Sequence, residues 1–267
     1  MRRLTGLSPA RERRMQMRLL KLMDRRFSVR FASEIGRATR AMIAEYEATG
    51  SAPALPLDHQ QTLAQIFEGL ASTAVATFGA RIVDQGKARG LVLETKGFAE
   101  FFQRIALEYI QGEAIRRRIT LIAETTRSQI VRQITRGQED GLGINEIAKG
   151  IADNTGSISR GRGRLIARTE THGAANAGAD AAARSTGLTM RKEWLSAVDM
   201  RTRRISDGDE FGHLSMNGQT VDMDQPFAMP KRDGTTIQAM FPGHPDLPAS
   251  AVINCRCAVA HIVDDGF

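Results

Sequence analysis

The chain has 267 residues, of which 42% are apolar and 25% are charged. These proportions are near the globular norm and exclude wholesale disorder. Aromatic residues make up only 5% of the chain, which argues against recognition of bases by aromatic stacking. Two cysteines are too few to cross-link a chain of this length into a disulfide scaffold, so that class of protein is excluded. No uninterrupted apolar run approaches the roughly 18 residues that span a bilayer, so we predict no membrane partner. The first 30 residues lack the apolar core of a secretory signal, so we predict no secretory leader.

Positive charge is concentrated at the N-terminus. The net charge is +7, and residues 1–40 hold 12 basic and 3 acidic residues. Phe27, Phe31 and Ile35 are four residues apart, which places them on one helix face. Residues 1–57 are therefore predicted to form a basic amphipathic helical arm. The basic residues assigned to nucleic-acid or portal binding are Arg11, Arg13, Arg14, Arg18, Lys21, Arg25, Arg26 and Arg30.

Several partners suit such an arm. It could bind nucleic-acid phosphates, an acidic protein surface or an anionic membrane. The alternative is a helix that packs in an assembly through its apolar stripe, with its charges solvated.

Residues 58–140 are predicted to be a helical region. Pro53 and Pro56 break the first helix, and Asp58 can cap the next one. Apolar residues at helical spacing then cover 63–83, and a further helical stretch follows Gly97 and continues toward residue 134.

Residues 141–267 are predicted to form a small α+β domain. A short helix is expected after Asn145, and a glycine-rich stretch at 154–163 separates it from an alanine-rich helix at about 165–184. After Gly187 the periodicity drops toward two, which indicates strands. The whole chain is thus predicted as α+β: a helical N-terminal region followed by a small α+β domain with short antiparallel strands.

Several short strands are expected in this domain. Met190, Lys192 and Trp194 begin the first. The run from 216 to 221 carries the pair Asn217-Gly218, a strong hairpin signal. The third covers 252–263 and carries Cys255 and Cys257 on one face.

Cys255 and Cys257 are the clearest candidates for a functional site. A disulfide between them would be strained, because residues two apart in an extended chain have Cα atoms about 6.5–7 Å apart. A shared metal suits them better if a bulge brings the thiolates together, and zinc would need about two more ligands. The alternative is a pair of small buried residues in a core strand.

The missing ligands would come from histidines. His261 lies about 13 Å beyond Cys257 on an extended strand, which is too far. His213, His244 and His172 are the remaining candidates.

Two further motifs have mainly structural interpretations. The segment from Asp199 to Arg204 favours an ion-paired turn in which guanidinium groups fix nearby carbonyls or carboxylates, with an anion site as the alternative. Arg168 and His172 share a helix face, but no nucleophile elbow, Walker loop, H-E-x-x-H or dinucleotide fingerprint accompanies them. We therefore expect no catalytic residues and no enzyme.

Several blocks occur in a characteristic order between about residues 140 and 263. They are 167–171 (ARTET), Trp194, 199–203 (DMRTR), His213 before 217–219 (NGQ), Phe227, 241–243 (FPG) and 254–257 (NCRC). Together they resemble the phage Mu F-like (head morphogenesis) minor capsid family. The residues that match its motif, in a structural role, are Arg168, Thr169, Glu170, Trp194, Asp199, Arg201, Arg203, Asn254 and Arg256.

One position departs from that pattern. The family's histidine normally follows the D-x-R-T-R block by about three residues, whereas this chain has Ile205, Ser206 and Asp207 there. His213 precedes Asn217 by four residues, as the family pattern expects. An insertion before His213 is therefore inferred, and the resemblance extends to a metal site of Cys255, Cys257 and His213 with zinc as its ion.

The resemblance implies a minor capsid protein of a tailed phage or prophage-derived particle. It would lie in the capsid interior or at the portal vertex of the virion, after assembly in the host cytoplasm. Its expected partners are the portal protein, the major capsid or scaffold protein, and packaged DNA through the basic arm. Its expected roles are head assembly, DNA packaging and DNA ejection.

A metal-dependent hydrolase or effector is the alternative. It would use Cys255, Cys257 and a histidine, with Glu170 or Asp199 as base. Similar domains occur fused to toxins, but the sequence ends at Phe267, so we expect no additional catalytic domain.

Overall fold

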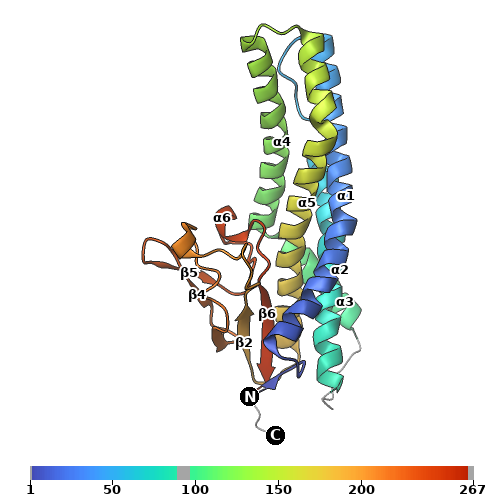
Figure 1. The fold of residues 1–267 in the computed structure, drawn as a ribbon. Coiled ribbons are helices and arrows are strands. Elements are labelled where there is room, and N and C mark those ends of the chain that lie inside the picture. The colour runs from blue at the N-terminus through green and yellow to red at the C-terminus, as the bar shows by residue number, and fades with distance from the viewer. Residues whose placement is uncertain (1, 89–96, 264–267) are drawn as a thin grey trace. The chain divides into compact units, whose positions relative to one another are not determined.

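The computed structural model of the chain describes residues 2–88 and 97–263. Apart from a two-residue strand at its start, the chain is helical up to residue 185, and short strands follow (Figure 1). The helices are α1 (Pro9–Thr49), α2 (His59–Ala88), α3 (Phe98–Gln111), α4 (Glu113–Glu139), α5 (Ile144–Ser185), the 3-10 turn η1 (Ile205–Asp207) and α6 (Ala249–Val252). The strands are β1 (Arg2–Arg3), β2 (Met190–Leu195), β3 (Thr220–Asp222), β4 (Phe227–Pro230), β5 (Thr236–Ala239) and β6 (Ala258–Val263).

The strands form two small antiparallel sheets. The larger one has the order β1-β6-β2-β3, and β4 and β5 form a separate pair. Strands β2 and β6 pair along their full length, with Trp194 opposite Val259. This arrangement confirms the predicted α+β class, with a helical N-terminal region followed by a small α+β part.

The chain divides into two compact units that interleave in sequence. The helical unit comprises Asp24–Gly69 and Gln111–Ala167. The sheet unit comprises Met1–Met23, Leu70–Ile110 and Arg168–Phe267. Helices α1, α2 and α5 each contribute residues to both units.

The predicted apolar face of α1 is buried in the helical unit. Phe27, Phe31 and Ile35 are each at most 1% exposed, and the ring of Phe31 packs edge-on against that of Phe67 at 5.4 Å between centroids. Burial of each such side chain stabilises the fold by about 1.5–3 kcal/mol. Farther along, α1, α4 and α5 share a second cluster. Its members are Met42, Ile43, Tyr46, Ile130, Ile134, Ile147, Ala148 and Ile151.

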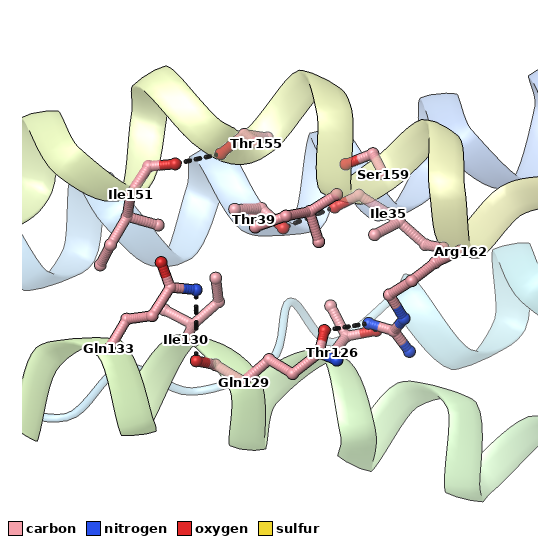
Figure 2. A pocket seen from close by; sticks show the side chains of 11 residues that line it. Ile35, Thr39, Thr126, Gln129, Ile130, Gln133, Ile151, Thr155, Ser159 and Arg162 are labelled. Carbon is pink, nitrogen blue, oxygen red and sulfur yellow. Dashed lines mark hydrogen bonds between the residues drawn. The ribbon is translucent and has the colours of Figure 1, made fainter.

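A small polar hollow lies between α1, α4 and α5 in this unit (Figure 2). Arg162 extends into it and donates to Thr126 Oγ1 at 2.9 Å and to Gln129 Oε1 at 3.1 Å. Burial lowers the pKa of Arg162 to about 10. Because its donors have acceptors, Arg162 is a buried charge with local polar partners.

The expected break at 154–163 does not occur, because α5 is continuous across it. A Cβ on Gly163 would lie 2.5 Å from the carbonyl oxygen of Ser28 and 2.7 Å from the amide nitrogen of Ala32. Glycine at this position therefore allows α5 to contact the backbone of α1. Tertiary packing thus outweighs the roughly 1 kcal/mol that glycine costs inside a helix.

The helical stretch after Gly97 is interrupted, whereas the sequence analysis continued it toward residue 134. Helix α3 ends at Gln111 and α4 begins at Glu113. Gly112 between them has an extended ψ of 138°, and its carbonyl accepts hydrogen bonds from the amides of Ile115 and Arg116 at 3.1 Å. Gly112 therefore ends one helix and caps the next.

Two strand expectations also need correction. Asn217 and Gly218 lie in a turn, with Gly218 at φ +85°. This turn leads into β3, which pairs with β2, and residues 213–218 before it are not a strand. The expected strand at 252–263 is a strand only in β6, from residue 258. Residues 249–252 form the helical turn α6, and Asn254 adopts a left-handed φ of +58° that redirects the chain.

Helix α2 is long and apolar enough to cross a membrane by length and composition alone. Half of its most apolar window is buried inside this protein. The core helix of a soluble protein meets the same two criteria, so α2 is weak evidence for a membrane span. The expected absence of a membrane partner stays a prediction.

Two glycines of α5 give a matched test of this packing. Gly163→Ala should lower the free energy of unfolding by about 1–3 kcal/mol, because the new methyl group overlaps the backbone of α1. In Gly161→Ala the new methyl group has no atom within 4 Å. This substitution should raise the free energy of unfolding by about 0.5–1 kcal/mol through helix propensity. Urea unfolding of both variants measures the difference. Equal stabilisation by the two substitutions would contradict the close approach of the helices.

Candidate metal centre

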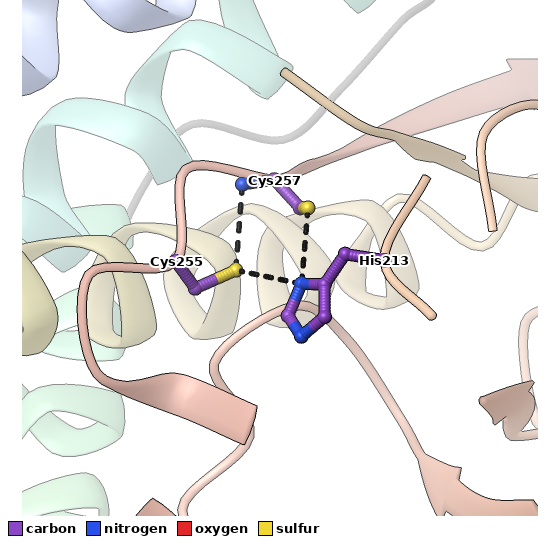
Figure 3. Close-up of side chains that lie close together, drawn as sticks. All are labelled: His213, Cys255 and Cys257. Carbon is purple, nitrogen blue, oxygen red and sulfur yellow. Dashed lines mark hydrogen bonds between the residues drawn. The ribbon is translucent and has the colours of Figure 1, made fainter. Parts of the chain in front are cut away.

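His213, Cys255 and Cys257 come together in the sheet unit. The Nδ1 atom of His213 lies 3.6 Å from Cys255 Sγ and 3.5 Å from Cys257 Sγ, so the imidazole faces both sulfur atoms (Figure 3). The possible ligand atoms all lie within 4.8 Å of one another, and all three residues are buried. Among the described residues, this is the one such group of three that could hold a metal ion.

A bent backbone, not a strand, brings the two cysteines together. They lie in the segment that joins α6 to β6, directly after the left-handed Asn254. The amide of Cys257 donates to Cys255 Sγ at 3.4 Å. The turn therefore places both sulfurs on the side of His213, whereas the sequence analysis relied on the side-chain alternation of a strand and a bulge.

The pKa values of the two neighbouring thiols are shifted in opposite directions. A hydrogen bond between them raises the pKa of Cys255 well above its usual value, and burial adds to this effect. The same hydrogen bond lowers the pKa of Cys257 well below its usual value, with contributions from His213 and from the indole of Trp194. Cys257 is thus the thiol that loses its proton more readily, and a bound cation would favour deprotonation of both thiols.

Two buried nitrogens at the site have no nitrogen or oxygen partner among the described residues. They are Nε1 of Trp194 and Nε2 of His213. The indole N–H of Trp194 faces Cys257, where it favours the thiolate. An N–H group directed at a sulfur ligand is a common outer-shell feature of metal sites.

The donor set suits zinc with one open position. Two thiolates and one imidazole supply three of the four ligands of tetrahedral zinc. Beside them is a solvent-open hollow that holds about one water molecule, lined in part by Arg201, Arg203 and Arg256. Water or a ligand from outside the chain could therefore occupy the fourth position.

The other histidines lie elsewhere. His172 is on α5 and buried, and burial lowers its pKa to about 3, so it is neutral. His244 lies 3.8 Å from Asp246 and against the ring of Phe241. His261 is on β6, opposite Lys192. Only His213 of the sequence candidates reaches the cysteines.

Comparison with known proteins identifies this part of the chain. Residues 128–260 match a family described as "Phage Mu protein F like protein".

Residues 128–260 of the chain belong to the phage Mu F-like family.

Two curated proteins are similar to this Mu F-like chain. It is 32% identical over 151 residues to "Minor head protein GP7" of Bacillus phage SPP1, covering 56% of this chain and 43% of that protein. It is 27% identical over 160 residues to "NAD(+)--arginine ADP-ribosyltransferase EFV" of Enterococcus faecalis (strain ATCC 700802 / V583), covering 58% of this chain and 30% of that protein. The chain thus spans less than half the length of either relative. No solved structure matches it.

The Mu F-like motif residues Asp199 and Arg256 form an ion pair at the rim of the site. Arg256 Nη2 donates to Asp199 Oδ1 at 2.6 Å, and its Nη1 pairs with the other carboxylate oxygen. This pairing holds the pKa of Asp199 well below its usual range, with help from the amide of Arg201. The carboxylate therefore pairs with a distant arginine, not with the arginines of its own turn.

Arg203 binds backbone carbonyls rather than a carboxylate. Its guanidinium donates to the carbonyl of Ala251 at 3.4 Å and also to that of Ile253. It thus fixes the backbone that leads into Asn254 and Cys255. Arg201 lies exposed beside the hollow.

The motif residues on α5 hold the same turn from the other side. Thr169 Oγ1 accepts a hydrogen bond from the amide of Asn254 at 3.2 Å, and Arg168 donates to Asn254 Oδ1 at 3.4 Å. Glu170 is buried on the same helix. Trp194, on β2, is fully buried against Phe227.

The sequence analysis missed Asn176. Its amide nitrogen donates to the carbonyls of Pro242 at 2.9 Å and Cys257 at 3.3 Å. Its oxygen accepts from the amide of Val259 at 3.0 Å. The available signal was a lone asparagine among alanines on a buried helix face, where an amide requires partners.

The predicted basic arm is mostly exposed. Arg13 is half-buried and donates to the carbonyl of Ser196 at 2.8 Å. Arg26 and Arg30 each lie 5.5 Å from the ring centroid of Phe27. The exposed members of the set are Arg11, Arg14, Arg18, Lys21, Arg25, Arg26 and Arg30.

Asn176→Leu should destabilise the protein by about 1–3 kcal/mol, because it leaves the buried carbonyl of Cys257 and the amide of Val259 without partners. The control is Asn154→Leu on the same helix, whose exposed amide bonds only to Gly150 O. The control should change stability by no more than about 0.5 kcal/mol. Urea unfolding of both variants measures the difference, and similar small effects would show that Asn176 does not hold the cysteine turn.

Proposed function

We propose that this protein is a minor head protein of a tailed phage or prophage-derived particle, with a structural rather than an enzymatic role. The observation that carries the proposal is the Mu F-like match over 128–260, together with the similarity to the SPP1 minor head protein. The protein would assemble in the host cytoplasm and end in the virion, at the portal vertex or capsid interior. The portal and the major capsid or scaffold protein would be its partners.

Mass spectrometry of particles produced with and without the gene tests this role. We expect the protein in purified particles at a low fixed ratio to portal. Particles that lack it should be misassembled, or defective in DNA packaging or ejection. A protein found free in the producing cell but absent from particles would contradict the proposal.

We further propose that His213, Cys255 and Cys257 bind a structural zinc ion. The supporting observations are the converging donor atoms and the buried nitrogens of Trp194 and His213. The ion would cross-link the turn before β6 to the segment that carries His213. The two cysteines would bind it as thiolates.

Metal analysis tests the zinc proposal. We expect about one zinc per chain in the purified protein, and loss of the zinc with a lower melting temperature in Cys257→Ser and His213→Ala. His244→Ala is the control, because this half-buried histidine lies outside the site. A chelator should lower the melting temperature of the wild type and not that of Cys257→Ser. Unchanged melting temperatures in the site variants would contradict a structural metal.

Packaged DNA is the proposed partner of the basic arm. Exposed arginines along α1 can neutralise phosphates without reading bases, so binding should be independent of sequence and weaken steeply with salt. Deleting the arm is a poor test, because the same helix buries Phe27 and Phe31.

Charge neutralisation tests the arm without removing its core residues. Replacing Arg14, Arg18, Lys21 and Arg25 with Gln should weaken duplex binding and reduce the slope of log K against log salt by up to about one per removed contact. The control replaces Arg116, Arg117, Arg132 and Arg136, four exposed arginines of α4. Fluorescence anisotropy over a salt series measures both. A slope unchanged by the arm substitutions would contradict DNA as the partner.

A metal-dependent hydrolase or effector is the second candidate. It is favoured by the open fourth position of the site and by the similarity to an ADP-ribosyltransferase, although the match covers only 30% of that protein. Against it, Asp199 is held in an ion pair that lowers its pKa, which makes it a weak base near neutral pH. Cys257→Ser distinguishes the roles: an enzyme would keep its fold and lose an activity, whereas a structural site would lose stability.

A further inference from the structure

The hollow beside the Cys–Cys–His site is lined by positive charge. Arg201, Arg203 and Arg256 line it, together with Asn254 and Thr202, and no acidic side chain is among its described lining residues. Asp199 neutralises Arg256 from outside this lining. The positive charge of the residues that line the hollow, its wall, therefore favours an anion as the ligand.

Two of these charges are held in place. Arg203 is fixed by the carbonyls of Ala251 and Ile253, and Arg256 by Asp199. Arg201 is exposed at the mouth of the hollow. An incoming carboxylate would meet two guanidinium groups held in place and the exposed guanidinium of Arg201, which can bind it with two hydrogen bonds.

Three exposed apolar residues adjoin, in sequence, residues that line the hollow, and we call them its apolar rim. Met200 is 89% exposed, Val198 48% and Ile253 39%, and each flanks a residue of the ion-paired turn or the cysteine turn. Val198 has a φ of +53°, a conformation that β-branched residues strongly disfavour. The hydrogen bonds of Asp199 to Thr202 and Arg201 hold the next residues of this loop in place. The loop thus keeps a large, fully solvated side chain beside a cationic hollow.

We propose that the loop 197–202 and the turn 253–256 form a docking site for an acidic segment of another head protein, with one carboxylate beside Arg201 and an apolar neighbour covering Met200. The charge of the wall requires an anion, and the apolar rim favours a polypeptide over the phosphates of DNA, which offer no apolar surface. The inference rests on the proposed head-protein role and adds the chemistry of a partner to it.

Site-specific photocrosslinking in assembling particles tests the site. The photoreactive residue p-benzoylphenylalanine replaces Met200, or replaces Leu121 on α4 as an exposed control. We expect position 200 to crosslink to one segment of a head protein that contains Asp or Glu, and Leu121 not to do so. Peptide mapping by mass spectrometry identifies the segment.

Charge reversal supplies the decisive comparison. Arg201→Glu should reduce crosslinking from position 200 at least tenfold, whereas Arg201→Lys and the exposed control Arg104→Glu should leave it within twofold. Replacing the mapped acidic residue with Lys should restore crosslinking to Arg201→Glu.

Three results would overturn the inference while leaving the head-protein role intact. They are crosslinks to DNA, crosslinks to a segment without acidic residues, and yields that do not respond to Arg201→Glu. Absence of position-200 crosslinks in particles that contain the protein would also overturn the inference alone. Absence of the protein from particles would overturn the head-protein role and this inference together.

Discussion

The site depends on the hydrogen bonds by which helix α5 holds the segment that carries the two cysteines. Asn176 bonds to the backbone on both sides of residue 258, and Thr169 and Arg168 hold Asn254. A turn that includes a left-handed asparagine would otherwise have many accessible conformations. Because its backbone groups are bound to a long rigid helix, the two sulfurs have a defined separation before any ion arrives.

Arginine is used in this domain chiefly as a cross-link between distant backbone segments. Arg203 binds the carbonyls of Ala251 and Ile253, and Arg256 pairs with Asp199, 57 residues earlier in the chain. The planar guanidinium can bind two acceptors at once, which suits small domains with short strands. The same two arginines place positive charge beside the cysteines. They therefore stabilise the fold and also favour an anion as the ligand of the hollow in the inference drawn above.

The combination of features explains how such a protein could serve in an assembly without catalysis. A sulfur-rich site close to a cationic, apolar-rimmed hollow can stabilise a fold and receive a partner at one place. The exposed basic residues of α1 would, in the role we propose for them, bind a polyanion. Neither role requires a general base, and the most exposed carboxylate at the site, Asp199, is already committed to an ion pair.

Local patterns in the sequence were sufficient for several features. The spacing of Phe27, Phe31 and Ile35 predicts a buried helix face, and these residues are buried. The C-x-C motif marks the cysteines, and the order of the short blocks indicates the family. Each of these depends on residues close in sequence, whose relation is set by backbone geometry alone.

Only the tertiary structure decided the rest. The spacing of residues left His213, His172 and His244 open and the family resemblance favoured His213, but its contact with both sulfurs depends on a fold that joins residues 42 and 44 positions apart. The glycine-rich stretch reads as a break, yet it is helical because Gly163 allows contact with the backbone of α1. Asn176 has no local motif that reveals its role, since its partners outside α5 lie 66 to 83 residues away. The sequence by itself determined the helical faces, the family and the candidate ligands, whereas long-range packing determined which of those ligands meet, because side chains so distant in sequence are brought together only by the completed fold.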